Sequence, residues 1–172
     1  FHDSHTAKLP NFLSAGIISR PSIVGLMTGI FDAGLELNER EDWWHGTVPT
    51  SMPLQLKKLG YRTTYWYGGS LTHGNFNQFA PACGFDAARS ATEFCGPDAP
   101  KTWVGVYDNV FLEKAADLIQ QEDSGQPEFH MLYTTTFHGP FKINLKNYGY
   151  TTEGIMPNAP KAIKEDKAIQ KE

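Results

Sequence analysis

The chain has 172 residues, of which 40% are hydrophobic and 13% aromatic, and its 15 Lys and Arg against 19 Asp and Glu give a net charge of −4. This composition is sufficient for one compact α/β domain, and the lack of a basic stripe argues against nucleic acid as a partner. No apolar run in the sequence approaches the roughly 20 residues needed to cross a bilayer.

The first predicted element is a helix over residues 21–28, PSIVGLMT, because proline is well tolerated in the first turn of a helix. This places Ser19 near the N-cap. Residues 31–49 are predicted to form a loop, in which Trp43 and Trp44 either pack or line the rim of a head-group site. A second helix is predicted over 51–59, with Ser51 as its cap and Gly60 as its stop.

The segment YRTTYWY, residues 61–67, is β-branched and aromatic and predicts a buried strand. Residues 70–105 are predicted to be mostly loop, with a short helix around 76–79. Asp108 is then expected to cap a helix that runs to about Gln121, and EFHMLYTTT, residues 128–136, predicts a second strand in which His130 is structural. This alternation of helices and strands indicates an α/β fold with a parallel sheet, whose functional residues gather at the carboxyl ends of the strands.

Cys83 and Cys95 flank a loop of the sequence CGFDAARSATEFC. They are either paired, as in an oxidising compartment, or two unrelated buried thiols, and we slightly favour the disulfide. Three residues near the start, His2, Asp3 and His5, have a spacing that suggests a metal, but a chain terminus is a poor place for a ligand set.

Ser19 has two interpretations. A hydroxyl at a helix N-terminus faces free backbone N–H groups and the positive end of the helix dipole, where an attacking oxygen or a bound oxyanion is stabilised. The neighbouring Arg20 adds a cation for phosphate or sulfate. On local sequence alone, however, capping is the more common use of such a serine.

The stretch SRPSIVGLMTG resembles the sulfatase signature of Cys or Ser, any residue, Pro, Ser, Arg, two small or apolar residues, and Leu-Leu-Thr-Gly. The residues in register are Ser19, Pro21, Ser22, Leu26, Thr28 and Gly29. LQLKKLGYRTTYWYGGSLTHGNFNQFAPACGFD, VYDNVFLEKAADLIQ and EFHMLYTTTFHGPF are similar, in order, to passages of lipoteichoic acid synthases and phosphoglycerol transferases. The chain thus resembles the sulfatase branch of the alkaline phosphatase superfamily over about residues 8–148.

The resemblance implies an alkaline-phosphatase-like three-layer α/β/α fold with a mostly parallel sheet. It also implies that Ser19 is the nucleophile and a metal ligand, and that His138 contacts the substrate or transfers a proton at the leaving oxygen. Arg20, His73 and Asn75 are expected to bind substrate. From the residues alone, the loop YGGSLTHGNFN either holds a polar head group such as glycerol phosphate or only forms a turn at its glycines. Without the resemblance, His138 is predicted to be only a hydrogen-bonded loop histidine.

One position departs from the family pattern, since Ile23 stands where the signature has arginine. A plain serine and the missing arginine favour a phosphotransferase over an ordinary sulfatase. The resemblance then implies transfer of phosphoglycerol from a lipid donor through a Ser19 ester. The alternatives are a sulfatase or phosphodiesterase that acts on sulfated or phosphorylated small substrates, and a non-catalytic relative that binds glycan or lipid head groups.

The family's metal would be Mn²⁺ or Mg²⁺, or Ca²⁺ in a sulfatase, and its other ligands would precede Phe1 and follow Glu172. We therefore expect residues 1–172 to be part of one sulfatase-like catalytic domain that lacks its first strand and its C-terminal metal-ligand segment. The resemblance places the whole protein outside the cytoplasm, at the bacterial cell envelope, with membrane association through segments absent from this chain.

Overall fold

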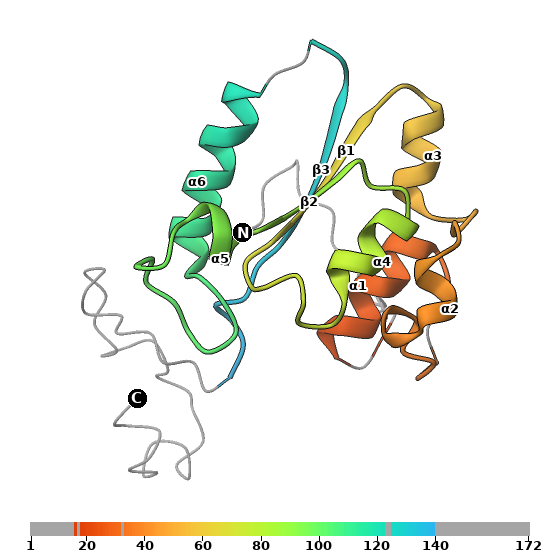
Figure 1. Cartoon of the computed structure of the whole chain (residues 1–172), viewed down its shortest axis with the longest axis horizontal. Helices are drawn as coiled ribbons and strands as arrows, with labels where there is room; N and C mark the ends of the chain where they lie inside the picture. The colour runs from red at the N-terminus through yellow and green to blue at the C-terminus, as the bar shows by residue number, and fades with distance from the viewer. Residues whose placement is uncertain (1–15, 17, 32, 123–124, 140–172) are drawn as a thin grey trace, which may run out of the picture.

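A computed structural model describes residues 16, 18–31, 33–122 and 125–139 of the chain (Figure 1). His2, Asp3 and His5, whose spacing suggests a metal, lie outside these residues. The helices are α1 Ser19–Thr28, the 3₁₀ turn η1 Leu37–Glu39, α2 Glu41–Trp44, α3 Met52–Lys58, α4 Phe76–Ala82, α5 Ala91–Phe94 and α6 Asp108–Gln121. The strands are β1 Arg62–Tyr67, β2 Ala87–Ser90 and β3 Glu128–Tyr133.

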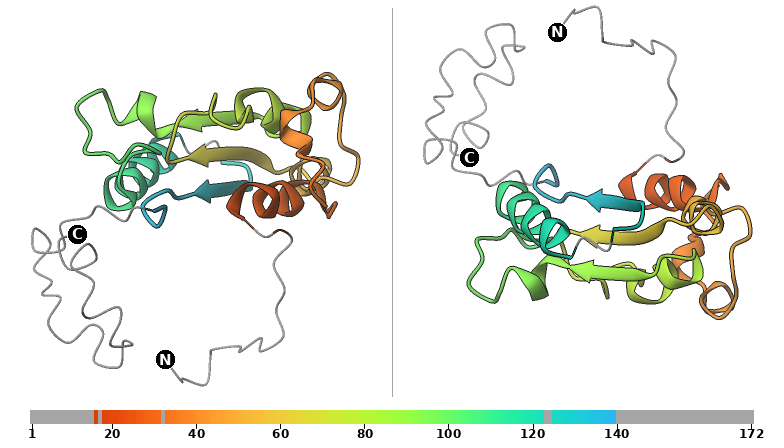
Figure 2. Two further views of the ribbon diagram at one scale, coloured as in Figure 1. Left: turned by 90° about the horizontal axis from the view of Figure 1, so that it is seen from below. Right: turned by 90° about the horizontal axis from the view of Figure 1, so that it is seen from above.

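The three strands form one parallel sheet in the order β2-β1-β3, and Figure 2 shows them side by side. Tyr67, the last residue of β1, is level with Ser90 in β2 and with Tyr133 in β3, so the three carboxyl ends meet at one edge. Five of the six residues of β1 are buried, as expected of a central strand covered on both faces.

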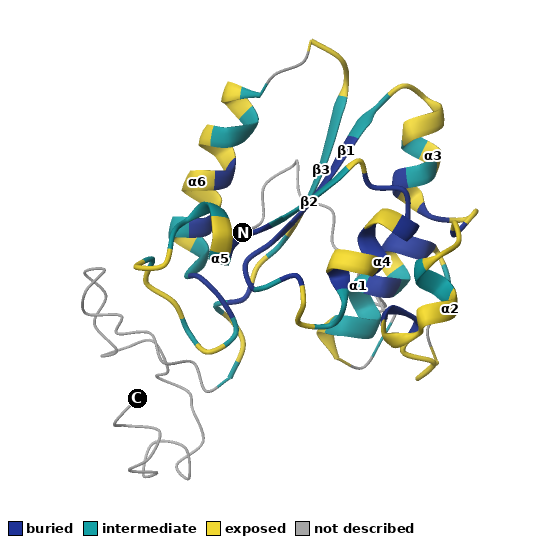
Figure 3. Cartoon of the chain, viewed as in Figure 1, coloured by how far each residue is buried: buried dark blue, intermediate teal, exposed yellow. Residues whose placement is uncertain are grey.

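Alternate residues of β1 enter two different hydrophobic cores, because successive side chains of a strand point to opposite faces. Tyr65 and Tyr67 pack with side chains of α1 and α4, whereas Trp66 packs with side chains of α5 and α6. Figure 1 accordingly shows α1 to α4 on one side of the sheet and α5 and α6 on the other. The buried residues lie along the sheet and the inner sides of these helices (Figure 3). This three-layer arrangement confirms the predicted α/β fold with a parallel sheet.

Two parts of the sequence prediction were wrong in detail. The stretch 70–105 contains the predicted short helix, α4, but also β2 and α5, which the sequence did not predict, and residues 31–49 contain η1 and α2. Trp43 and Trp44 pack against the core on the α1 side, and the Trp44 indole donates to the Asn38 carbonyl at 3.0 Å. The packing interpretation of this pair therefore accounts for its position.

The expected disulfide is also wrong, because both cysteines are free. Cys83 belongs to the core on the α1 side of the sheet, whereas Cys95 packs against the core on the α6 side. The sheet thus separates the two thiols. Burial raises the pKa of Cys83 to about 12, so this thiol stays protonated and unreactive near neutral pH.

His130 has a structural environment, as the sequence predicts. Its Nδ1 accepts a hydrogen bond from the Trp66 indole at 3.1 Å, and its Nε2 lies 3.0 Å from a carboxylate oxygen of Glu128. Because an indole N–H can only donate, Nδ1 carries the lone pair and Nε2 carries the proton that faces Glu128.

Among the described helices, none is both long and apolar enough to cross a membrane.

Candidate active site

The site begins at the N-terminus of α1, where the chain passes from an extended Ile18 into the helix at Ser19. No side chain caps this helix end, so the Ser19 hydroxyl does not serve as the N-cap. The Ser22 hydroxyl instead donates to the carbonyl of Ile18 at 2.9 Å and to that of Gly16 at 3.1 Å. The capping interpretation of Ser19 is therefore wrong, and its exposed side chain is available to the neighbouring cavity.

Other residues of the signature shape the helix itself. The Thr28 hydroxyl donates to the Val24 carbonyl at 2.8 Å, and Gly29 ends the helix at a φ of 71°, a conformation that favours glycine. Ile23, which replaces the signature arginine, packs against the core on the α1 side. Most of the signature stretch thus builds α1, and its first two residues, Ser19 and Arg20, reach the cavity.

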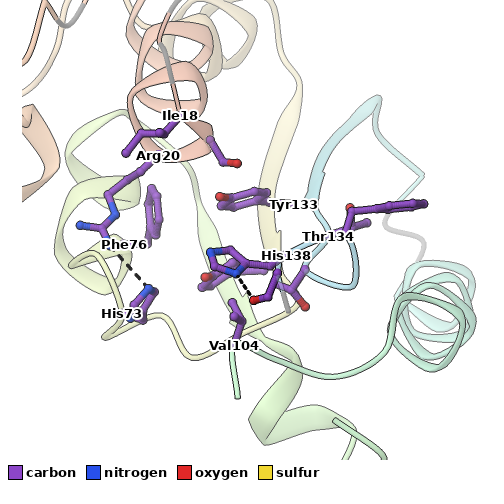
Figure 4. A pocket seen from close by; sticks show the side chains of 13 residues that line it. Ile18, Arg20, His73, Phe76, Val104, Tyr133, Thr134 and His138 are labelled. Carbon is purple, nitrogen blue, oxygen red and sulfur yellow. Dashed lines mark hydrogen bonds between the residues drawn. The ribbon is translucent and has the colours of Figure 1, made fainter. Parts of the chain in front are cut away.

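A cavity of about 620 Å³ lies between the start of α1 and the carboxyl ends of β1 and β3. Four of the five residues predicted as site residues line it, namely Ser19, Arg20, His73 and His138. The full lining is Ile18, Ser19, Arg20, Tyr67, His73, Phe76, Val104, Tyr133, Thr134, Thr135, Phe137, His138 and Gly139 (Figure 4). The structure thus brings together residues that are more than 100 positions apart in the sequence.

Arg20 is held at the side of the cavity by Glu39, whose carboxylate lies 2.8 Å from the guanidinium. The same guanidinium approaches Nε2 of His73 at 3.5 Å, a contact drawn in Figure 4. Because arginine only donates, Nε2 of His73 is the acceptor in this contact. Both side chains of the ion pair are about one-third exposed, at 35% and 33%, so the pair fixes the direction of Arg20 more than it stabilises the fold.

Asn75 is not among the residues that line the cavity. It adopts a left-handed φ of 53°, and its amide donates to the second carboxylate oxygen of Glu39. Glu39 also accepts from Asn38 at 3.3 Å. Asn75 therefore binds Glu39, and Glu39 in turn orients Arg20 at the cavity.

Two tyrosines at the strand ends form part of the cavity wall. Tyr67 and Tyr133 stack with ring centroids 5.0 Å apart. Burial raises the pKa of Tyr67 to about 12 and also raises the pKa of Tyr133. A side-chain hydrogen bond with Ser19 and the charge of Arg20 act against the shift at Tyr133. The Tyr133 hydroxyl is thus a neutral hydrogen-bonding group beside Ser19 at ordinary pH.

His138 lies on the opposite side of the cavity from α1 (Figure 4). Its Nδ1 is 2.8 Å from the Gly139 carbonyl, which also accepts from the Trp103 indole at 3.2 Å. Trp103 meets the imidazole edge-on, with ring centroids 5.0 Å apart. Since a carbonyl only accepts, Nδ1 of His138 is the donor in this contact and carries a proton.

Close backbone contact fixes the loop of residues 104–106 beside the cavity. Gly69 pairs with Gly105 in an antiparallel bridge, and a Cβ on Gly105 would lie 2.4 Å from the Gly68 carbonyl oxygen. The glycines after β1 therefore do more than form a turn, because they let residues 104–106 pack directly against the end of this strand. Val104 reaches the cavity from this loop.

Sequence reasoning missed several residues of the site. Tyr67, Tyr133, Thr134 and Thr135 stand at the carboxyl ends of the predicted strands, so the rule that such ends carry function would have found them. No sequence signal marks Glu39, which is one of several acidic residues in a polar stretch.

Among the described residues, no three His, Cys, Asp or Glu side chains come together as metal ligands. Of the metal ligands that the sequence analysis expects, Ser19 is the one that belongs to the described residues. These residues do not by themselves form a metal centre.

The fold and the cavity define a class of α/β proteins with a serine hydroxyl at a helix start beside the strand ends. Solved structures with this fold include the lipoteichoic acid synthase LtaP from Listeria monocytogenes, with a TM-score of 0.66 and 23% identity. The match covers 85% of this chain and 33% of LtaP. Another is an alkaline phosphatase superfamily protein from Vibrio parahaemolyticus, with a TM-score of 0.51 and 24% identity over 62% of this chain and 26% of that protein.

A sequence model of the sulfatase family matches residues 4–163, which is most of the chain. The chain belongs to the sulfatase family. It spans about a third or less of the length of the two solved structures.

Proposed function

We propose that the protein transfers phosphoglycerol, or a related phosphoryl group, from a lipid donor through a covalent ester on Ser19. The observation that carries this proposal is the cavity in which Ser19, Arg20 and His138 meet. An uncapped helix N-terminus and a guanidinium favour a bound phosphate, and the hydroxyl lies where both act on it.

The proposed reaction has two steps. In the first step, Ser19 Oγ bonds to phosphorus as the bond from phosphorus to the lipid alcohol breaks. The Ser19 proton passes to water, and the imidazolium of His138 gives its Nε2 proton to the departing alcohol. In the second, an acceptor hydroxyl attacks phosphorus and gives its proton to His138, while Ser19 Oγ leaves and takes a proton from water. His138 thus returns to its starting form.

The remaining side chains would orient these groups. Arg20, held by Glu39, would pair with the phosphate oxygens, and Tyr133 would hold the Ser19 hydroxyl. His73 lies beside Arg20 at the cavity wall and would contact the glycerol. Asn75 would contribute through Glu39.

The proposal includes a divalent ion, Mn²⁺ or Mg²⁺, which neutralises phosphate charge and acidifies a hydroxyl when bound. Ser19 is the only ligand that the proposal assigns within this chain, and the others belong to the remainder of the protein. On this account residues 1–172 are part of one catalytic domain. The whole protein acts outside the cytoplasm at the bacterial cell envelope, and segments outside this chain associate with the membrane.

A comparison of substrates tests the proposal. The intact protein is incubated with a phosphatidylglycerol analogue or an aryl sulfate, in the presence of Mn²⁺ and with and without a chelator. We expect the phospholipid analogue to be turned over and the aryl sulfate not to be. Either the chelator or Ser19→Ala should abolish this turnover. Turnover of only the aryl sulfate would refute the transferase.

A second candidate is hydrolysis of sulfate or phosphate esters, as the membership of the sulfatase family suggests. In a sulfatase, with Ca²⁺ as the expected ion, Ser19 would be converted to formylglycine, and mass spectrometry of the peptide that contains it would show the loss of two hydrogens. A third is a relative that only binds glycan or lipid head groups. It would bind the phospholipid analogue and turn over neither substrate.

A further inference from the structure

Asp108 stands at the start of α6, where the sequence predicts a helix cap, but its side chain does not cap this helix. Its Oδ1 accepts hydrogen bonds from the backbone N–H groups of Thr135 and Thr136, at 2.9 and 3.0 Å. The backbone N–H of Asp108 in turn donates to the Thr136 hydroxyl at 2.7 Å. Three hydrogen bonds therefore join the start of α6 to the segment that leaves β3.

The same segment carries His138. The backbone N–H of His138 donates to the Thr135 carbonyl at 3.1 Å, so the turn that presents the imidazole is closed on Thr135. Thr135 is only 5% exposed, and its hydroxyl donates to the Val106 carbonyl at 3.2 Å. The position of Thr135 thus sets where the backbone of His138 lies, and Asp108 holds Thr135.

Hydrogen bonds from two N–H groups to one carboxylate are charge-assisted and stronger than the bonds that water or a neutral acceptor would make. Asp108 is not among the residues that line the cavity. We propose that Asp108 is a positioning residue, which fixes the turn of Thr135 and Thr136 and thereby holds His138 at the cavity.

This proposal rests on the proposed function only for its kinetic test. In that test, Asp108→Ala is expected to lower kcat for the phosphatidylglycerol analogue by about 10–100-fold, the loss expected from a displacement of about 1 Å, with KM changed much less. Asp108→Asn keeps an oxygen acceptor and is expected to restore most of kcat. Asp117→Ala is the matched control, because Asp117 is an exposed acidic residue of the same helix.

A double-mutant cycle separates positioning from simple loss of stability. If Asp108 acts through His138, adding Asp108→Ala to His138→Gln lowers kcat no further. Additive losses in the two variants would overturn the proposal.

A second readout does not depend on activity. The imidazole resonances of His73 and His138, assigned by NMR through single substitutions, are compared in the wild type, Asp108→Ala and Asp108→Asn. We expect Asp108→Ala to shift the His138 signals and leave those of His73 unchanged, with Asp108→Asn close to the wild type. Unchanged His138 signals in folded Asp108→Ala would overturn the proposal, whatever reaction the protein catalyses. If Asp108→Ala does not fold, wild-type His138 signals in Asp108→Asn support the proposal and shifted ones overturn it.

Discussion

The contact between Gly105 and the end of β1 gives the sharpest prediction about the fold around the cavity. A Cβ on residue 105 would lie 2.4 Å from the Gly68 carbonyl oxygen, 2.7 Å from its carbon and 2.8 Å from the Gly69 Cα. Favourable contacts between such atoms lie at about 3.5–4.0 Å. Because all three neighbours are backbone atoms, no side chain can turn aside, and Gly105→Ala must push the two loops apart by about 1 Å.

The cost has two parts. Overpacking of a well-packed region typically costs about 1–3 kcal/mol. The displacement also weakens the hydrogen bond from the Val106 N–H to the Gly68 carbonyl, now 2.9 Å long, which contributes about 1 kcal/mol. We therefore expect Gly105→Ala to lower the free energy of unfolding by roughly 2–4 kcal/mol.

Urea unfolding followed by tryptophan fluorescence measures this change, since the chain has four tryptophans. Gly46→Ala is the control, because a Cβ there meets no atom within 4 Å and Gly46 has no left-handed φ. Its stability should change by no more than about 0.5 kcal/mol. Equal unfolding midpoints for the two variants would refute the close approach of the loops.

Three other predictions concern thiols, acid stability and phosphate binding. Alkylation of the native protein at pH 8 should label Cys95 well before Cys83, whose pKa is raised by burial to about 12, and disulfide-linked peptides under non-reducing conditions would contradict this separation. Burial opposes ionisation of Asp86, but hydrogen bonds from Lys57 and Thr63 outweigh it and lower the pKa of this carboxyl. The ionised Asp86 therefore stabilises the fold above its unfolded pKa of about 3.9, and this stabilisation is lost as the pH falls through the lower pKa of the folded state. Thermal unfolding from pH 6 to pH 2 should show a smaller loss of stability in Asp86→Asn than in the wild type, and equal losses would disprove the assignment. Finally, Arg20→Gln should weaken binding of the phospholipid analogue by about 10–100-fold, because a charged hydrogen bond contributes about 1.5–3 kcal/mol; calorimetry that finds unchanged affinity would exclude Arg20 as a phosphate ligand.

Local sequence patterns were sufficient for the elements that frame the cavity. The aromatic and β-branched run in β1 and the apolar spacing of α6 predict a strand and a helix, because these residues fit a pleated or helical surface directly. β2 was missed because its sequence, AARS, has little β propensity, and it becomes a strand by pairing with β1 from Thr64 to Tyr67.

The features that the sequence could not predict depend on tertiary contacts. Asp108 precedes a helical pattern and so predicts a cap, yet its partners are 27 and 28 residues further along the chain. Cys83 and Cys95 are close in sequence, but they fall on opposite sides of the sheet. Ser19 and His138 were predicted as site residues from their family positions, and Arg20 and His73 from their local chemistry. The structure places all four around one cavity. Their catalytic and binding roles remain predictions.

The central claim, a covalent phosphoryl ester on Ser19, is tested most directly by peptide mass spectrometry of the intact protein quenched during turnover. The protein is incubated with a phosphatidylglycerol analogue and Mn²⁺, denatured in acid and digested. We predict a phosphoglycerol adduct on Ser19 that is absent from Ser19→Ala. An adduct on another residue, or unmodified Ser19 throughout turnover, would contradict the account.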